Sequence, residues 1–108
     1  MEFKIESNLL DACALSILSM GDTYGYEITQ KFQKAISVSE STLYPVLRRL
    51  RNDGLCRTYD KPFQGRNRRY YAITDEGEEK LRFYRQEWSE YRSAIESILN
   101  GGSDNEQE

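Results

Sequence analysis

The chain has 108 residues, 38% of them hydrophobic, and a formal net charge of −3. This length fits one domain with a modest core, and no apolar run is long enough to span a bilayer. The chain has no histidine and two distant cysteines, so neither a zinc site nor a disulfide framework is indicated. Since no export signal is present, we expect the cytosol as the compartment.

The negative net charge conceals an uneven distribution. Residues 40–75 contain eight cations and four anions and therefore carry +4, whereas the remainder, with seven cations and 14 anions, carries −7. A phosphate backbone within a Debye length of this segment responds to its local charge. The segment is therefore a candidate for contact with a polyanion.

Two helices are predicted in the first third of the chain. The first is capped by Ser7 or Asn8 and stopped by Gly21. It is apolar almost all round, so we expect other elements, or a second subunit, to cover it. The second covers about 24–35, and Gly25 near its start favours a close approach of the backbone to a partner.

A third helix is predicted from Ser39 or Ser41 to about residue 52, after a short connector. Its apolar residues recur at i, i+3, i+4 and i+7, and so form one face: Leu43, Val46, Leu47 and Leu50. The opposite face carries Ser41, Pro45, Arg48 and Asn52, flanked by Tyr44 and Arg49. Because a proline inside a helix removes a backbone hydrogen bond, either the helix starts close upstream of Pro45 or its first turn is bent.

A β-hairpin is predicted after the third helix. Segments 55–59 and 69–74 have strand composition, and they flank a loop, 60–68, that contains proline, glycine and three cations. An isolated hairpin is marginally stable, so we expect this basic wing to pack on the helices.

A long helix is predicted from a Thr74 cap to about residue 99, with carboxylates in its first turn. Its apolar residues are spaced 3, 4, 3, 4, 3: Leu81, Tyr84, Trp88, Tyr91, Ile95 and Ile98. Such a heptad-like seam needs a partner, and we expect self-association. The acidic tail, 100–108, is expected to be disordered.

Together these elements predict a mainly α protein with a small β-hairpin, of the α+β class. The order of three helices, a basic hairpin and a long helix is that of a winged helix-turn-helix. We expect residues 1–74 to bind DNA and residues 75–99 to dimerise within the same compact domain.

Several motifs resemble the PadR family of bacterial transcriptional regulators. They are YGYEI at 24–28, STLYPVLRRL at 41–50, GL at 54–55, RRYY at 68–71 and TDEG at 74–77. The resemblance covers about residues 9–99, and the single helix after the wing is similar to the short PadR subfamily.

The resemblance implies a homodimer formed through the last and first helices. It implies that each third helix enters a major groove of a pseudo-palindromic operator, with the wing at the backbone or minor groove. It also implies repression, often relieved by a small aromatic effector. The candidates for an effector pocket or dimer interface are Leu10, Cys13, Ala14, Ile17, Leu81, Tyr84, Trp88, Tyr91, Ile95 and Ile98. Trp88 is interpreted as dimer core, effector platform, or both.

The candidates for DNA contact are hydroxyl, phenol and cationic side chains, which suit phosphates and guanine edges. From the helices they are Tyr24, Ser41, Thr42, Tyr44, Arg48 and Arg49, and from the wing Lys61, Arg66, Arg68 and Arg69. Alternatively, Arg48 and Arg49 pair with surface carboxylates, Thr42 is only a helix-start residue, and the tyrosines pack. The alternative for the wing cations is that they are ordinary solvated loop charges. Strand alternation places Arg68 and Arg69 on opposite faces, so they do not both serve one partner.

Catalysis is not expected, because the sequence lacks a histidine base, a phosphate-binding glycine loop and clustered metal ligands. No cofactor is expected either. The alternative function is a winged-helix protein–protein interaction module without specific DNA binding, which uses the same third helix on an acidic or peptide partner.

Overall fold

The computed structural model describes residues 3–101. The elements follow in the order α1 (Ser7–Ser19), β1 (Thr23–Tyr24), α2 (Gly25–Gln33), α3 (Glu40–Asn52), β2 (Cys56–Phe63), β3 (Arg66–Ile73) and α4 (Asp75–Leu99). The predicted α+β class is confirmed, and the hairpin gains a short third strand, giving the sheet order β1-β3-β2. The predicted acidic tail lies outside the described residues except for Asn100 and Gly101.

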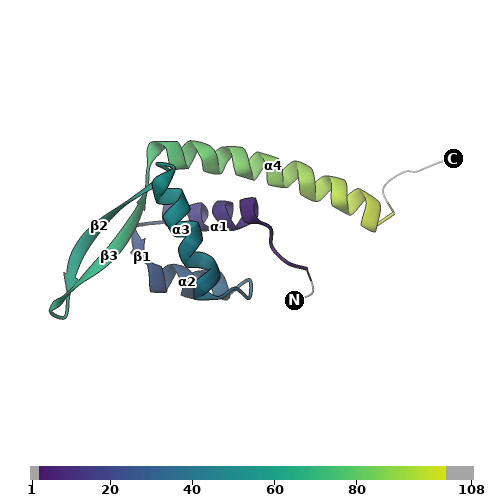
Figure 1. Ribbon diagram of the computed structural model, residues 1–108. Coiled ribbons are helices and arrows are strands. Elements are labelled where there is room, and N and C mark those ends of the chain that lie inside the picture. Colours follow the sequence, from purple (N-terminus) through teal and green to yellow (C-terminus); the bar gives the residue numbers. More distant parts are fainter. Residues whose placement is uncertain (1–2, 102–108) are drawn as a thin grey trace.

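Helix α1 is the centre of the molecule, since it contacts the three other helices and β3. Ala14 and Leu15 in this helix are completely buried. The other core side chains come from all the helices and from the base of the hairpin: Leu10, Leu18, Ile28, Phe32, Leu43, Val46, Leu47, Leu50, Cys56 and Leu81. Figure 1 shows α1 beneath α4, with the hairpin β2–β3 projecting on one side and the end of α4 on the other. Neighbouring elements therefore cover α1, as predicted.

The first helix starts one residue earlier than a Ser7 cap predicts and two earlier than an Asn8 cap predicts. Its N-cap is Glu6, whose carboxylate accepts a hydrogen bond from the Asn8 backbone N–H at 2.9 Å. Neither Ser7 nor Asn8 is therefore the cap. A carboxylate in this place also interacts favourably with the positive end of the helix.

The second helix is shorter than predicted at both ends. Residues 23 and 24 form β1 and pair with Tyr71 and Tyr70 of β3, so α2 begins only at Gly25. It ends at Gln33, whose side-chain amide donates to the Val38 carbonyl oxygen at 2.6 Å and so organises the turn before α3. Two residues are too short a strand to leave an alternating pattern in the sequence.

The hairpin strands are longer than predicted, and the predicted loop 60–68 is mostly strand. Phe63 pairs with Arg66, which leaves only Gln64 and Gly65 in the turn, with φ of 52° and 78°. A two-residue turn with two positive φ angles matches the right-handed twist of the flanking strands. This outer part buries neither face, so its sequence shows no apolar alternation.

Helix α4 is fixed to the body at its first turn. The Thr74 hydroxyl accepts a hydrogen bond from the Gly77 N–H at 3.0 Å and donates to the Gly54 carbonyl oxygen at 2.7 Å. The predicted Thr74 cap is thus confirmed. A Cβ at Gly77 would overlap the Leu55 carbonyl oxygen and lie 2.7 Å from Ile73 Cγ1. The absence of a side chain at Gly77 therefore lets α4 approach the base of the hairpin.

Candidate nucleic-acid interface

Helix α3 is amphipathic as predicted. Its four apolar residues, Leu43, Val46, Leu47 and Leu50, are each at most 3% exposed. Ser39 is the N-cap, and its hydroxyl accepts a hydrogen bond from the Thr42 N–H at 3.2 Å. The helix is continuous through Pro45, its sixth residue. The outward face presents exposed Ser41, Thr42, Tyr44, Pro45 and Arg48.

Tyr44 is positioned by the start of α2. A Cβ added at Gly25 would lie 3.2 Å from Tyr44 Cε1, so the glycine leaves space for the phenol ring. The close approach expected at Gly25 is therefore made by the chain's own Tyr44. The ring remains 42% exposed, and partial burial together with the charge of Glu40 raises the pKa of its hydroxyl, which stays protonated at neutral pH. Tyr44 can therefore donate a hydrogen bond to an anion.

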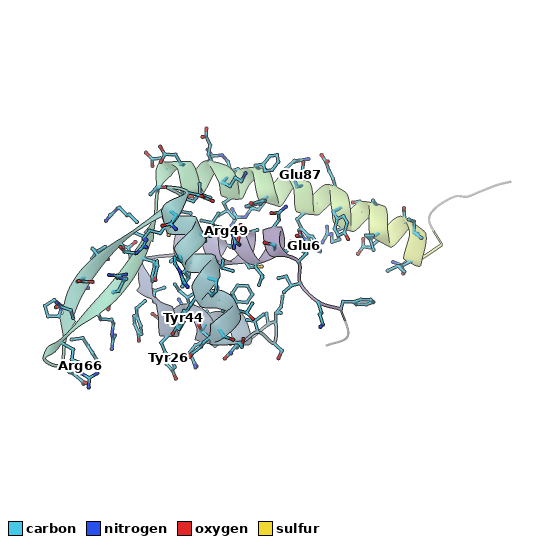
Figure 2. All side chains as sticks on the ribbon, viewed as in Figure 1. Glu6, Tyr26, Tyr44, Arg49, Arg66 and Glu87 are labelled. Carbon is cyan, nitrogen blue, oxygen red and sulfur yellow. The ribbon has the colours of Figure 1, made fainter. Side chains whose placement is uncertain are left out.

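Arg49 lies apart from this exposed row. Its guanidinium forms an ion pair with Asp11 of α1 and also donates to the Ser7 hydroxyl at 3.5 Å. This arrangement matches the alternative in which an arginine of the third helix pairs with a carboxylate. Figure 2 shows Arg49 at the end of α3 nearer α4, whereas Tyr44 lies at the opposite end.

The wing has two chemically different faces, as strand alternation predicts. One face holds cations and rings on both strands, and we call it the cation–aromatic face: Arg57, Tyr59, Lys61, Phe63, Arg66, Arg68 and Tyr70. On the other face Arg69 lies beside Asp60, with Nε 3.9 Å from Oδ1. Arg68 and Arg69 are thus separated, and Arg69 has its own carboxylate neighbour.

Tyr24 belongs to the base of the wing and not to the helix. Its ring contacts the ring of Tyr70 edge-on, with centroids 5.6 Å apart, and the guanidinium of Arg68 lies over it at 3.9 Å. Tyr24 therefore packs against the wing through its ring, and contact of Tyr24 with DNA stays a prediction. Figure 2 shows Tyr26 and Tyr44 on the side of the molecule remote from α4, with Arg66 at the wing tip.

The candidates for a pocket or dimer interface fall into three groups by burial. Leu10, Ala14 and Leu81 are at most 9% exposed and belong to the core of one chain, so they offer no surface to a partner. Cys13, Ile17 and Tyr84 are half-buried. The exposed members are Trp88, Tyr91, Ile95 and Ile98.

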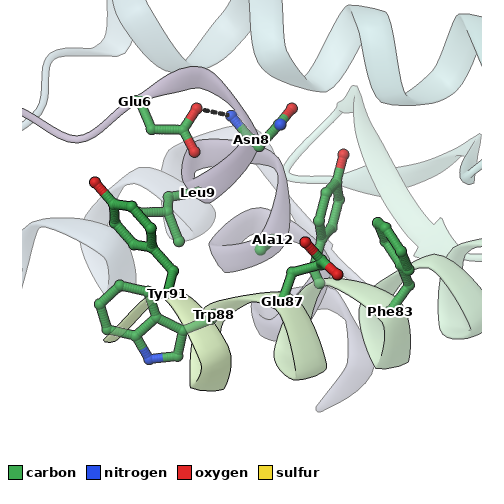
Figure 3. Close-up of a pocket in the computed structure, with 9 residues that line it drawn as sticks. Glu6, Asn8, Leu9, Ala12, Phe83, Glu87, Trp88 and Tyr91 are labelled. Atoms are coloured by element: carbon green, nitrogen blue, oxygen red, sulfur yellow. Dashed lines mark hydrogen bonds between the residues drawn. The ribbon is translucent and has the colours of Figure 1, made fainter. Parts of the chain in front are cut away.

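Two hollows lie between α1 and α4. One, of about 280 Å³, is lined by rings from α4 and by the start of α1: Glu6, Asn8, Leu9, Ala12, Phe83, Tyr84, Glu87, Trp88 and Tyr91. Figure 3 shows the rings of Trp88 and Tyr91 at one end of this hollow and Phe83 at the other, with Glu87 between them. The second, of about 360 Å³, shares Tyr84 and Trp88 and includes Cys13.

Several residues of the site have no place in the sequence-based candidates, among them Asp11 and Phe63. Asp11 is the only charged residue of α1, and a lone carboxylate in an apolar helix signals a buried partner. Phe63 belongs to a run in which Arg57, Tyr59, Lys61 and Phe63 alternate cation and ring. These four side chains are every second residue, so they lie on one face of a strand. This period of two predicts a strand in the outer wing although no apolar alternation is present.

The part of the chain that the structure describes has no helix able to cross a membrane and no cluster of metal ligands.

The chain was compared with known protein families and solved structures. The model of the transcriptional regulator PadR-like family matches residues 14–83.

Solved structures from several bacteria are similar to the chain. The protein smu.1704 from Streptococcus mutans UA159 is 39% identical, with a TM-score of 0.87 over 97% of this chain and 99% of that one. A PadR family transcription regulator from Clostridium difficile R20291 is 31% identical, with a TM-score of 0.77 over 83% and 97%. A PadR-like transcriptional regulator from Bacillus cereus is 35% identical, with a TM-score of 0.76 over 84% and 91%.

Proposed function

Since the chain belongs to the PadR-like family of transcriptional regulators, we propose that it is a repressor that binds a pseudo-palindromic operator as a homodimer. Family membership makes it a DNA-binding regulator and not an enzyme, as the sequence predicts. The repressor action, the homodimer and a small aromatic effector are the proposal. A regulator must meet the genome, so we also propose a cytosolic location.

The observation that carries the proposal is the exposed face of α3. Ser41, Thr42, Tyr44 and Arg48 are exposed on one helix whose opposite face is buried in the core. A helix supported in this way can enter a major groove, where an arginine reads guanine and hydroxyl groups bind phosphates. We assign these four side chains to DNA contact, with Lys61 and Arg66 of the wing at the backbone.

The homodimer is supported by the outer half of α4. Figure 1 shows this half projecting beyond α1. Its apolar side chains are 38 to 77% exposed: Trp88, Tyr91, Ile95 and Ile98. A helix that projects into water with an apolar seam gains stability when a second helix covers it. A dimer also carries two α3 helices, which we expect to meet successive major grooves about one helical turn of DNA apart.

The effector proposal is supported by the α1–α4 hollow of about 280 Å³. Phe83, Tyr84, Trp88 and Tyr91 offer ring faces and edges, and Glu6 and Glu87 offer acceptors. A planar aromatic compound with a donor group fits this chemistry. Because α1 also contacts α3, an occupant that shifts α1 can change the spacing of the two α3 helices.

The test is capture of genomic fragments by the purified full chain, followed by titration of a captured fragment at several salt concentrations. Binding through phosphates predicts a steep fall in affinity as salt rises, with a slope of about −0.9 for each phosphate contacted. A scrambled fragment should bind more weakly at every salt concentration. Failure to form any DNA complex would refute the proposed function as a DNA-binding repressor. The protein-interaction module would then be the remaining candidate function.

A further inference from the structure

Arg68 lies between two aromatic rings on the cation–aromatic face of the wing. Its guanidinium carbon is 3.5 Å from the centroid of Phe63 and 3.9 Å from that of Tyr24. No carboxylate lies within ion-pair distance of Arg68 among residues 3–101. Both rings are thus within cation–π distance of the guanidinium, a planar group that can stack on aromatic faces as a lysine ammonium cannot.

The two rings belong to different parts of the fold. Tyr24 precedes α2 and pairs with Tyr70 in the sheet, so it belongs to the body of the molecule. Phe63 is the last residue of β2, next to the turn, and pairs with Arg66. Arg68 therefore connects the body to the wing tip across the outer, exposed part of the hairpin.

This connection matters because the outer hairpin has little other support. Lys61 lies directly opposite Arg68 in the ladder, and like charges in that position are destabilising. The rings offset this repulsion, since Lys61 lies 5.1 Å from the Tyr70 centroid while Arg68 is held by Tyr24 and Phe63. A two-stranded hairpin without a buried face is otherwise marginal.

We propose that Arg68 is a positioning residue that ties the wing tip to the body through Tyr24 and Phe63, and so holds Lys61 and Arg66 in place for the DNA backbone. The inference rests on the proposed DNA-binding function. It separates Arg68 from the phosphate contacts with which the sequence groups it.

Conservative variants distinguish positioning from direct contact. Arg68→Lys keeps a charge for a phosphate but cannot stack as a plane, so positioning predicts a loss of DNA affinity of about 3- to 30-fold. Phe63→Leu should cause a similar loss of DNA affinity, although this substitution changes no charge. Phe63→Tyr keeps the ring and should bind within about twofold of wild type. Tyr24→Phe should also be neutral, because only the ring face is used.

The double variant Phe63→Leu/Arg68→Lys gives the decisive coupling. If Arg68 acts through Phe63, the double variant binds about as well as the weaker single variant. The proposal would be overturned if the loss of affinity in the double variant equals the product of the two single losses. It would also be overturned if the Arg68→Lys protein binds like wild type. Lys61→Ala serves as the matched control. If Lys61 contacts a phosphate directly, its removal should reduce the magnitude of the salt slope by about 1.

A measurement on the free full-length protein keeps this test separate from the test of function. The Arg68 side-chain protons should show upfield ring-current shifts by NMR, and these should become smaller in Phe63→Leu, which leaves only the Tyr24 ring. Amide exchange along the outer wing should become faster in the same variant. Arg68 proton shifts without a ring-current effect in wild type would overturn the proposed role of Arg68, even if the protein binds DNA. Failure of wild type to bind DNA would instead contradict the proposed function, whatever the Arg68 shifts.

Discussion

Arg49 of α3 forms an ion pair with Asp11 of α1, so a cation of the proposed DNA-reading helix is held by the central helix of the core. Asp11 is only 8% exposed. Burial raises the pKa of this carboxyl above its usual value, and the hydrogen bond from Arg49 opposes the rise without cancelling it. Tyr84 is close enough for the charges of both residues to affect its pKa, which partial burial raises.

The raised pKa of Asp11 predicts how stability depends on pH. The folded chain holds the Asp11 proton more tightly than the unfolded chain, so this contribution is complete below the usual value of 3.8 and is lost as pH rises through the folded value. Urea unfolding should show the advantage of wild type over Asp11→Asn to be greatest near about pH 3 and smaller near about pH 7. An advantage that grows with pH would mean that Arg49 dominates the ionisation.

Gly77→Ala should destabilise the protein strongly. The added methyl would overlap the Leu55 carbonyl oxygen, so either α4 or the base of the hairpin must move. We expect a loss of about 3 kcal/mol and a fall in Tm of more than about 10 °C. Glu76→Ala, at an exposed neighbouring position, is the control and should have little effect. Equal Tm values for the two variants would refute the close packing at Gly77.

The sequence predicts the helical part of the fold because its signals are local. Period-3.6 apolar residues mark α3, and Thr74 marks the start of α4. The outer wing is different, since Phe63 and Arg66 pair without burying a face and leave no apolar pattern. Contacts between distant segments, such as Asp11 with Arg49, depend on how the helices pack and are not encoded in local spacing.

The candidate site was predictable to a similar degree. Exposed side chains of α3, including Tyr44 and Arg48, follow directly from the position of its apolar face. The surroundings of each cation do not follow, because Arg68 lies between rings and Arg69 lies beside Asp60 on adjacent positions of one strand. Composition alone makes these arginines equivalent.

Ser39 can be used to separate folding from DNA binding. Its hydroxyl caps α3, so Ser39→Ala should cost about 1 kcal/mol in urea unfolding. Ser39→Asp should keep the cap and the stability, but its charge near the phosphates should weaken DNA binding about fivefold. A Ser39→Asp protein that binds like wild type would place the start of α3 away from the DNA.

The exposed seam of α4 predicts a dimer that one charge disrupts. Ile95→Asp places an unpaired carboxylate in the seam, so dimerisation should weaken by at least about tenfold. Glu90→Ala, an exposed change outside the proposed seam, is the control. Sedimentation velocity at micromolar concentration should give a dimer for wild type and the control, and mainly monomer for Ile95→Asp. A monomeric wild type would contradict the seam.

The central claim is that α3 reads bases while the wing holds the backbone, and base preference tests it directly. Wild type, Arg48→Ala and Lys61→Ala are each titrated against a captured operator and a set of its single-base variants. We predict that Arg48→Ala loses about 1 to 3 kcal/mol on the operator and no longer discriminates at one position, whereas Lys61→Ala binds all sequences more weakly and keeps the preference. An Arg48→Ala protein with an unchanged preference profile, together with a Lys61→Ala protein whose profile changes, would contradict the assignment of α3 as the reader.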